Sequence, residues 1–137
     1  MIFYELKISY TRQTGEDNPK AVKETYLVEG LTAADVEERL LGEIQKYISG
    51  EWETKSCKQV QFYDLIPNPE GDQCYKARVE MITIEDNGKE KRKAVTIYVQ
   101  AGNITEANKL LHQSVSNLDC EVISITRSPI LEVFRAV

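Results

Sequence analysis

The chain has 137 residues, 42% of them hydrophobic, and a compact domain of this size removes about two-thirds of its unfolded surface from water. The formal net charge of −5 disfavours a general nucleic-acid binder, because such proteins carry an excess of lysine and arginine. No apolar stretch approaches the roughly 20 residues of a membrane span, and the first five residues lack the basic start of a signal peptide. We therefore expect a cytoplasmic protein that does not interact with membranes.

Two predicted strands open the chain. Apolar and polar residues alternate over about 2–12, which is typical of a strand with one buried face. The turn formers of 14–19 then predict a hairpin that leads into a return strand over about 21–29. This pair of strands is expected to be antiparallel.

A helix is predicted next. Thr32 is its expected N-cap, and Leu31 and Val36 occupy the two positions of a hydrophobic staple. We expect Gly50 to end the helix and a third strand to cover about 54–63. The expected apolar stripe consists of Ala34, Leu40, Leu41 and Ile44, and the expected outer face consists of Asp35, Glu37, Glu38 and Glu43.

The second half predicts the same elements in the same order. The Asn87-Gly88 pair is a strong hairpin signal between a strand over 74–84 and a return strand that ends near 100. A second helix follows over about 104–118, with either Asn103 or Thr105 as its cap. The last strand begins at about 121–126, and Pro129 marks a bulge, an edge or a break in it.

The two halves also repeat each other in their residues. Similar residues recur at a nearly constant spacing, and small insertions in hairpins and loops would explain the drift in that spacing. The matched positions are Tyr4 and Tyr75 (75 − 4 = 71), Tyr26 and Tyr98 (98 − 26 = 72), Leu31 and Ile104 (104 − 31 = 73), and the closing strands 62–66 and 130–134 (130 − 62 = 68).

The predicted fold class is α+β, an internally duplicated β-β-α-β unit with antiparallel sheets and two helices packed on one side. We assign about 2–66 to repeat one, 67–73 to a linker and about 74–134 to repeat two of a single pseudo-symmetric domain, 1–137. The linker is too short to separate independent domains, so the repeats are expected to share one core. Their three-stranded sheets either stay separate or join into one curved sheet. The tyrosines expected to point into the core are Tyr4, Tyr10, Tyr26, Tyr75 and Tyr98.

We find no catalytic, metal-binding or cofactor-binding pattern in the sequence. The single histidine, His112, is expected at the surface or boundary of the second helix, and zinc sites need several converging ligands. The seven glycines form no phosphate-binding motif. Cys57, Cys74 and Cys120 are odd in number and lack CxxC spacing, so we expect reduced and unreactive thiols. We predict a protein that is not an enzyme and has no cofactor or metal.

Some residues suit binding. A basic hairpin can contact phosphates, although exposed lysines also protect an edge strand from aggregation. Lys7 and Arg78 occupy equivalent outward positions in the two repeats, and Trp52 either caps the core or anchors a partner. The hairpin cations are Lys89, Lys91, Arg92 and Lys93.

Repeated, open strand edges favour a non-enzymatic interaction module that binds a protein partner or a second copy of itself as a homo-oligomer. The alternative is a nucleic-acid-binding accessory protein that uses the basic hairpin. Charge-neutralising substitutions in this hairpin would separate the two functions, because phosphate contacts make binding sensitive to salt.

Four short segments also carry a resemblance to a known family. They are Tyr26-Leu27-Val28, Tyr47-Ile48-Ser49-Gly50-Glu51-Trp52, Tyr75-Lys76 and Ile130-Leu131-Glu132-Val133-Phe134. Together they resemble an uncharacterised bacterial domain-of-unknown-function family that we associate with gut Bacteroidetes and their phages or mobile elements. The resemblance spans nearly the whole chain and implies a small cytosolic single-domain protein without an assigned activity. It carries over no functional residue.

Overall fold

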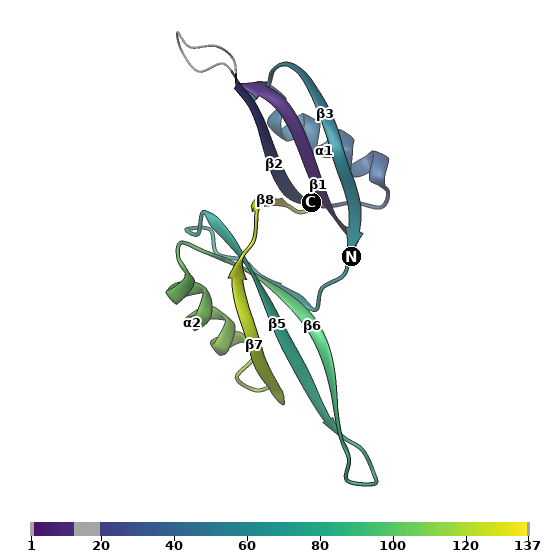
Figure 1. Ribbon diagram of the computed structural model, residues 1–137, viewed down its shortest axis with the longest axis vertical. Coiled ribbons are helices and arrows are strands. Elements are labelled where there is room, and N and C mark those ends of the chain that lie inside the picture. The colour runs from purple at the N-terminus through teal and green to yellow at the C-terminus, as the bar shows by residue number, and fades with distance from the viewer. Residues whose placement is uncertain (1, 13–19, 137) are drawn as a thin grey trace. The chain divides into compact units, whose positions relative to one another are not determined.

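The computed structural model describes residues 2–12 and 20–136, so the turn predicted over 14–19 lies outside the described residues. The strands form two four-stranded sheets, each with one α-helix, which confirms the α+β class (Figure 1). The elements are β1 Phe3–Arg12, β2 Lys20–Glu29, α1 Ala33–Ile44, the 3-10 helix η1 Gln45–Tyr47, β3 Ser49–Val60, β4 Asp64–Ile66, β5 Gln73–Ile84, β6 Glu90–Ala101, α2 Ile104–Ser114, β7 Cys120–Arg127 and β8 Ile130–Phe134.

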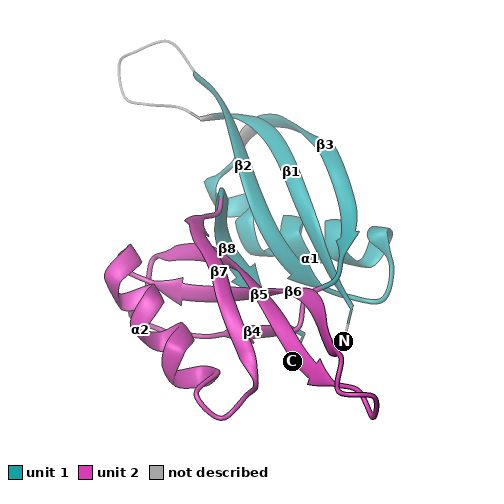
Figure 2. Ribbon diagram, turned by 60° about the horizontal axis from the view of Figure 1, so that its bottom comes forward, with its two compact units in different colours: residues 1–61, 129–137 teal, residues 62–128 magenta. Residues whose placement is uncertain are grey.

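The chain divides into two compact units (Figure 2). Unit 1 comprises 1–61 and 129–137 and holds the sheet β3-β1-β2-β8, whereas unit 2 comprises 62–128 and holds the sheet β4-β6-β5-β7. Two clusters of buried side chains are found, one between each helix and its own sheet, and the expectation of one shared core stays a prediction. Each amphipathic helix therefore buries its apolar stripe against the sheet of its own unit.

The strand registers show how the two units correspond. Tyr4 lies opposite Val28 in unit 1, and Tyr75 lies opposite Val99 in unit 2, an offset of 71 in both strands (75 − 4 = 71, 99 − 28 = 71). The helices begin at the same offset (104 − 33 = 71). Even the bulges correspond, because the outer strand shifts register opposite residues 7 and 8 in unit 1 and opposite residues 78 and 79 in unit 2.

This constant offset corrects the expected match between Tyr26 and Tyr98. The counterpart of Tyr26 is Ile97, and both belong to the core clusters under the helices. Tyr98 lies opposite Lys76, on the face of the sheet that points away from α2, which we call the helix-distal face. There its ring meets Phe62 edge to face, with 5.2 Å between the ring centroids. Because the expected alignment was shifted by one residue, it assigned Tyr98 to the face under the helix instead of the helix-distal face.

The closing strands are exchanged between the repeats. β4 follows β3 in the chain, yet it pairs in parallel with β6 of unit 2, with Leu65 opposite Tyr98. In the same way β8 follows β7 but pairs in parallel with β2 of unit 1, with Val133 opposite Leu27. Pro129 marks a break, because the chain passes from unit 2 to unit 1 at this residue. The boundary near Gln61 also differs from the linker expected over 67–73.

Helix α1 begins as expected but differs elsewhere. The Asp35 N–H donates to Thr32 Oγ1 at 3.1 Å, which confirms the predicted cap. The side chain of Leu31 is 77% exposed, so the predicted staple is absent, and the helix ends at Ile44 instead of near Gly50. Gly50 lies within β3 at a φ of +83°, a conformation that favours glycine. The buried stripe consists of Val36, Leu40 and Ile44, whereas Ala34 is exposed and Leu41 is half-buried.

Helix α2 settles the choice between the two predicted caps. The Glu106 N–H donates to Asn103 Oδ1 at 2.8 Å, and the Glu106 carboxylate accepts a hydrogen bond from the Gly102 N–H at 3.1 Å. Asn103 is therefore the cap, at the position that corresponds to Thr32 (103 − 32 = 71). The buried helix positions also correspond between the units, namely Val36 with Ala107, Leu40 with Leu111, and Ile44 with Val115.

Candidate interaction surfaces

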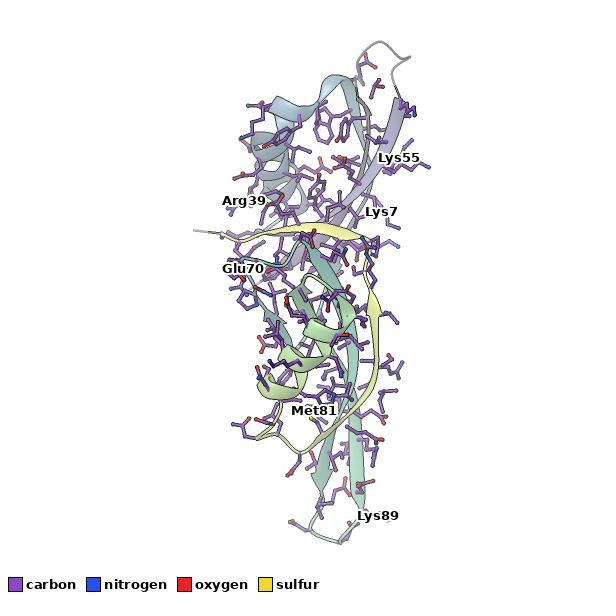
Figure 3. The ribbon with its side chains drawn as sticks, turned by 90° about the vertical axis from the view of Figure 1, so that its left-hand side faces the viewer. Lys7, Arg39, Lys55, Glu70, Met81 and Lys89 are labelled. Carbon is purple, nitrogen blue, oxygen red and sulfur yellow. The ribbon has the colours of Figure 1, made fainter. Side chains whose placement is uncertain are left out.

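The hairpin of β5 and β6 extends beyond the third strand of its sheet. β7 pairs with β5 only from Tyr75 to Met81, so the sheet continues past this point as a two-stranded ribbon, residues 82–93. The Asn87-Gly88 turn is confirmed, because the Glu85 N–H donates to the Lys89 carbonyl at 2.8 Å and Gly88 has a φ of +86°. Figure 3 shows Lys89 at the far end of the ribbon and Met81 closer to α2.

The ribbon separates its side chains onto two faces, because residues directly opposite each other in a pair share a face. On the helix-distal face Ile82 lies opposite Arg92, and Ile84 lies opposite Glu90. On the other face, which continues the side of the sheet covered by α2, Lys93 lies opposite Met81 and Lys91 lies opposite Thr83. The four cations predicted as one basic group therefore divide, with Arg92 on one face and Lys91 and Lys93 on the other.

Arg92 is held by three carboxylates. Its Nε donates to Glu90 Oε2 at 3.0 Å, and its Nη1 donates to Glu121 and, at 3.5 Å, to Glu80. The hydrogen bonds to Glu121 and Glu90 raise the pKa of Arg92, so the guanidinium stays charged. Within 2–12 and 20–136, Lys91 and Lys93 have no such ion pair, and both are exposed. Arg92 is thus the least available of the four predicted cations.

An apolar patch accompanies the Arg92 ion pairs. The Ile84 side chain is 65% exposed, and Ile82, on the same face, is half-buried. These two isoleucines were not predicted as binding residues, although their positions two apart in the strand indicate an aliphatic face. Contiguous apolar patches with a polar rim mark protein-binding surfaces, and Ile84 with Ile82 forms a small patch of this kind.

Lys7 and Arg78 occupy equivalent and exposed positions on the helix-distal faces of their own sheets. Lys7 lies between Thr25 and Ser56 on the neighbouring strands. In the same way, Arg78 lies between Thr96 and Ser124. Each cation therefore has a small hydroxyl group on either side. The two belong to different units, so each is a separate local feature.

Trp52 lies in β3, opposite Tyr10, and packs half-buried against the core of unit 1. Trp52 therefore contacts the core, and its role as an anchor for a partner stays a prediction. We had expected β3 to begin only near 54, so the sequence placed Trp52 before the strand that in fact contains it.

Unit 1 also has an open cleft of about 890 Å³ at the N-terminal end of α1. Leu31 and Gly30 line it, and its charged lining side chains are Glu29, Asp35, Glu38 and Arg39. Across the cleft, the Ala136 N–H donates to Glu29 Oε1 at 2.9 Å. Sequence reasoning missed this cleft because it treated Leu31 as a buried staple residue.

One polar cluster of unit 1 joins two tyrosines to one carboxylate. Tyr10 and Tyr26 both donate their hydroxyl hydrogens to Glu24. Burial, followed by this hydrogen bond and the negative charge of Glu24, raises the pKa of Tyr26 above the ordinary value of a tyrosine. The Tyr26 hydroxyl therefore remains a protonated donor to Glu24 at neutral pH.

The residues considered for chemistry form no joint site among the described residues. His112 is exposed on the outer side of α2, as expected. Burial and the nearby Glu37 raise the pKa of the Cys57 thiol, which disfavours the reactive thiolate. Cys74 is buried and Cys120 is half-buried. Among residues 2–12 and 20–136, no three His, Cys, Asp or Glu side chains are grouped so that they could hold a metal ion.

Comparison with known proteins places this two-unit fold in a family. The family model "Domain of unknown function (DUF4494)" matches residues 2–136. The chain belongs to the DUF4494 family. No curated protein matches this DUF4494 chain. In the part of the chain that the structure describes, no helix is both long enough and apolar enough to cross a membrane.

Proposed function

We propose that this DUF4494 chain is a non-enzymatic module that binds another protein through the helix-distal face of its ribbon. The observation that carries this proposal is the exposed Ile84 with the half-buried Ile82 on the same face, beside Arg92 and its three carboxylates. Such a patch combines an aliphatic centre with a charged rim, and arginine is one of the residues enriched at interfaces. Burial of Ile84 by a partner would contribute about 1.5–3 kcal/mol.

The test compares two substitutions on opposite faces of the ribbon. Ile84→Ser removes the aliphatic centre, whereas Thr83→Ser removes one methyl group from the other face and serves as the control. We expect wild type and Thr83→Ser to capture the same partner from a lysate of the source organism, or to self-associate in light scattering, and Ile84→Ser to lose this binding. Equal binding by all three chains, or a monomer without a partner at micromolar concentration, would contradict the proposal.

The second candidate function is nucleic-acid binding through the opposite face of the ribbon. Lys91 and Lys93 favour it, because they lie side by side on alternate positions of β6 without an ion pair to a described residue. A two-stranded ribbon fits the major groove of duplex DNA. Each phosphate contact contributes about 0.9 to the slope of log K against log salt concentration.

Anisotropy titrations of labelled DNA and RNA at two salt concentrations test this candidate. Replacing Lys91 and Lys93 together with glutamine should lower that slope by about 2, because two phosphate contacts are lost. Arg92→Gln is the matched control on the other face and should leave the slope unchanged. No saturable binding at low salt would exclude this function.

We also infer that the module acts in the cytoplasm. The three free cysteines support this location, since disulfides are rare in reducing compartments. The resemblance of its sequence segments to proteins of gut Bacteroidetes and their phages suggests its source. Mass spectrometry of peptides from fractionated cells of such a source would test both inferences.

A further inference from the structure

The outer edge of β3 is open among the residues that the structure describes. β3 has 12 residues and lies at one side of the unit 1 sheet, in the order β3-β1-β2-β8 (Figure 2). Its only described strand neighbour is β1. An edge of this length presents a row of backbone N–H and C=O groups that can pair with another strand. The directions of these groups decide which strand fits.

The hydrogen bonds of β1 show which residues of β3 turn their backbone groups outward. The Gly30 N–H donates to the Ile2 carbonyl, so even-numbered residues of β1 bond to β2 and odd-numbered residues bond to β3. On β3 the residues opposite odd positions, among them Glu53 and Lys58, are therefore bonded to β1. The residues whose backbone groups point to the open edge are Trp52, Thr54, Cys57 and Gln59.

A bulge selects the register in which this edge can pair with itself. The register shift opposite residues 7 and 8 leaves two residues, 55 and 56, between Thr54 and Cys57, where a regular strand has one. A regular partner strand would fall out of step on one side of this extra residue. An antiparallel second copy carries the same extra residue, so a twofold axis between residues 55 and 56 keeps both sides in step. Thr54 then exchanges hydrogen bonds with Cys57 of the second copy, and Trp52 with Gln59 of the second copy.

This register, which follows from the backbone alone, brings opposite charges together. Glu53 precedes Thr54 and Lys58 follows Cys57, so Glu53 of each copy lies opposite Lys58 of the other. Both lie on the helix-distal face and form a non-hydrogen-bonded pair, in which side chains approach most closely. Lys58 is exposed and has no ion pair to a described residue. Glu53 binds Lys55 of its own chain at 3.0 Å, yet its side chain is 68% exposed and accessible to a second cation.

Strand β7, the counterpart of β3 in unit 2, lacks this complementarity. Its bulge lies opposite residues 78 and 79, so the same construction places Glu121 opposite Thr126. Glu121 also binds Arg92 of its own chain already. Opposite charges thus favour self-pairing at the edge of β3 and not at the edge of β7.

We propose that two copies of this chain form a homodimer through antiparallel pairing of their β3 edges, with Glu53 of each copy facing Lys58 of the other. The pairing joins two four-stranded sheets into one continuous sheet across the twofold axis. The contact uses residues of unit 1, whereas the ribbon belongs to unit 2. It therefore goes beyond the proposed function, and its failure would leave the ribbon proposal untouched.

Charge reversal of either residue places like charges opposite each other in both contacts of the dimer. Analytical ultracentrifugation of the full chain at low ionic strength should show a dimer that forms as the concentration rises through the micromolar range. Glu53→Lys and Lys58→Glu should each weaken this dimer by about tenfold or more. Glu43→Lys on α1 and Lys109→Glu on α2 make the same changes in charge at exposed positions outside β3 and should leave the dimer unchanged.

An equimolar mixture of the two single variants separates the contact from any effect on folding. In the mixed dimer each reversed charge meets its opposite again, so the mixture should dimerise as wild type does, although neither variant does so alone. Gln59→Pro removes an N–H that points away from β1 and should also abolish the dimer.

The ribbon variant Ile84→Ser should keep the dimer, so the two proposals are read from different variants. A wild-type chain that stays monomeric at high micromolar concentration would overturn the β3 proposal. So would single charge reversals that dimerise like wild type, or a mixture that stays monomeric. A dimer that Ile84→Ser abolishes would assign self-association to the ribbon and would likewise overturn it.

Discussion

The pair Gly30 and Val36 offers a quantitative test of the packing between α1 and its sheet. A Cβ atom on Gly30 would lie 2.6 Å from Val36 Cγ1, closer than van der Waals contact allows. Unit 2 has alanine at both corresponding positions, Ala101 and Ala107, and both are fully buried. Glycine with valine, and alanine with alanine, are thus two solutions to the same packing problem. Replacing Gly30 and Val36 together by alanine would give unit 1 the residue pair that unit 2 has at these positions.

The single substitutions should each destabilise the chain. Gly30→Ala overfills the site and should cost about 2 kcal/mol, within the range of about 1–3 kcal/mol for overpacked cores. Val36 is fully buried, so Val36→Ala removes two carbon groups worth about 0.8 kcal/mol each and leaves a small cavity, a cost of about 2 kcal/mol. Independent effects would add to about 4 kcal/mol. We expect the double variant to lose only about 2 kcal/mol, because the new methyl group fills the new space.

Urea unfolding followed by fluorescence measures this cycle. Trp52 is the single tryptophan and packs against the same core as Val36, so its emission reports on unit 1. Gly42→Ala is the control, because Gly42 lies in α1 with open space around it and should gain up to about 1 kcal/mol in helix propensity. A double variant that loses the full sum, or a Gly30→Ala variant as stable as wild type, would refute the packing account.

Three further predictions follow from single groups. Gly71→Ala should lower the calorimetric Tm by several degrees, since the new Cβ would lie 2.6 Å from backbone atoms of Ala101. Gly50→Ala is the control, because its Cβ meets open space and adds only a backbone strain of about 1–2 kcal/mol. A wild-type Tm for Gly71→Ala would count against this prediction. The rate at which Cys57 reacts with iodoacetamide, followed by peptide mass spectrometry, should rise with pH with a midpoint above the pKa of about 8.5 of a free thiol. Glu37→Gln should lower this midpoint, because it removes a nearby negative charge. A midpoint at or below a pH of about 8.5 would show that burial does not protect the thiol. The folded-state pKa of Tyr26 is raised, so its contribution to stability is fully present below about pH 10 and is lost as the pH rises above that value; urea unfolding at several alkaline pH values should show a shallower decline for Tyr26→Phe, and equal declines would contradict the assignment.

Local patterns predicted much of each unit. The alternation in β1 and β5, the cap at Thr32 and the Asn87-Gly88 turn all depend on neighbouring residues, and the structure confirms them. The alignment failed at Tyr98, because a spacing of 72 instead of 71 matched two aromatic residues that point to opposite faces. Period-two patterns tolerate no shift of one residue.

The exchange of β4 and β8 could not be predicted from the sequence. Both closing strands are short and apolar, and both acceptor strands, β2 and β6, present similar residues at the pairing positions, Tyr26-Leu27-Val28 and Ile97-Tyr98-Val99. Either closing strand therefore suits either acceptor, and only the path of the whole chain selects between them.

The strand exchange is the central claim about the fold, because it decides which sheet each closing strand completes. Nuclear Overhauser effects between backbone protons of the ¹³C,¹⁵N-labelled full chain test it most directly. The account predicts cross-strand effects between Leu27 and Val133 and between Leu65 and Tyr98. Effects between Leu27 and Leu65, together with effects between Tyr98 and Val133, would mean that each repeat keeps its own closing strand and would contradict the account.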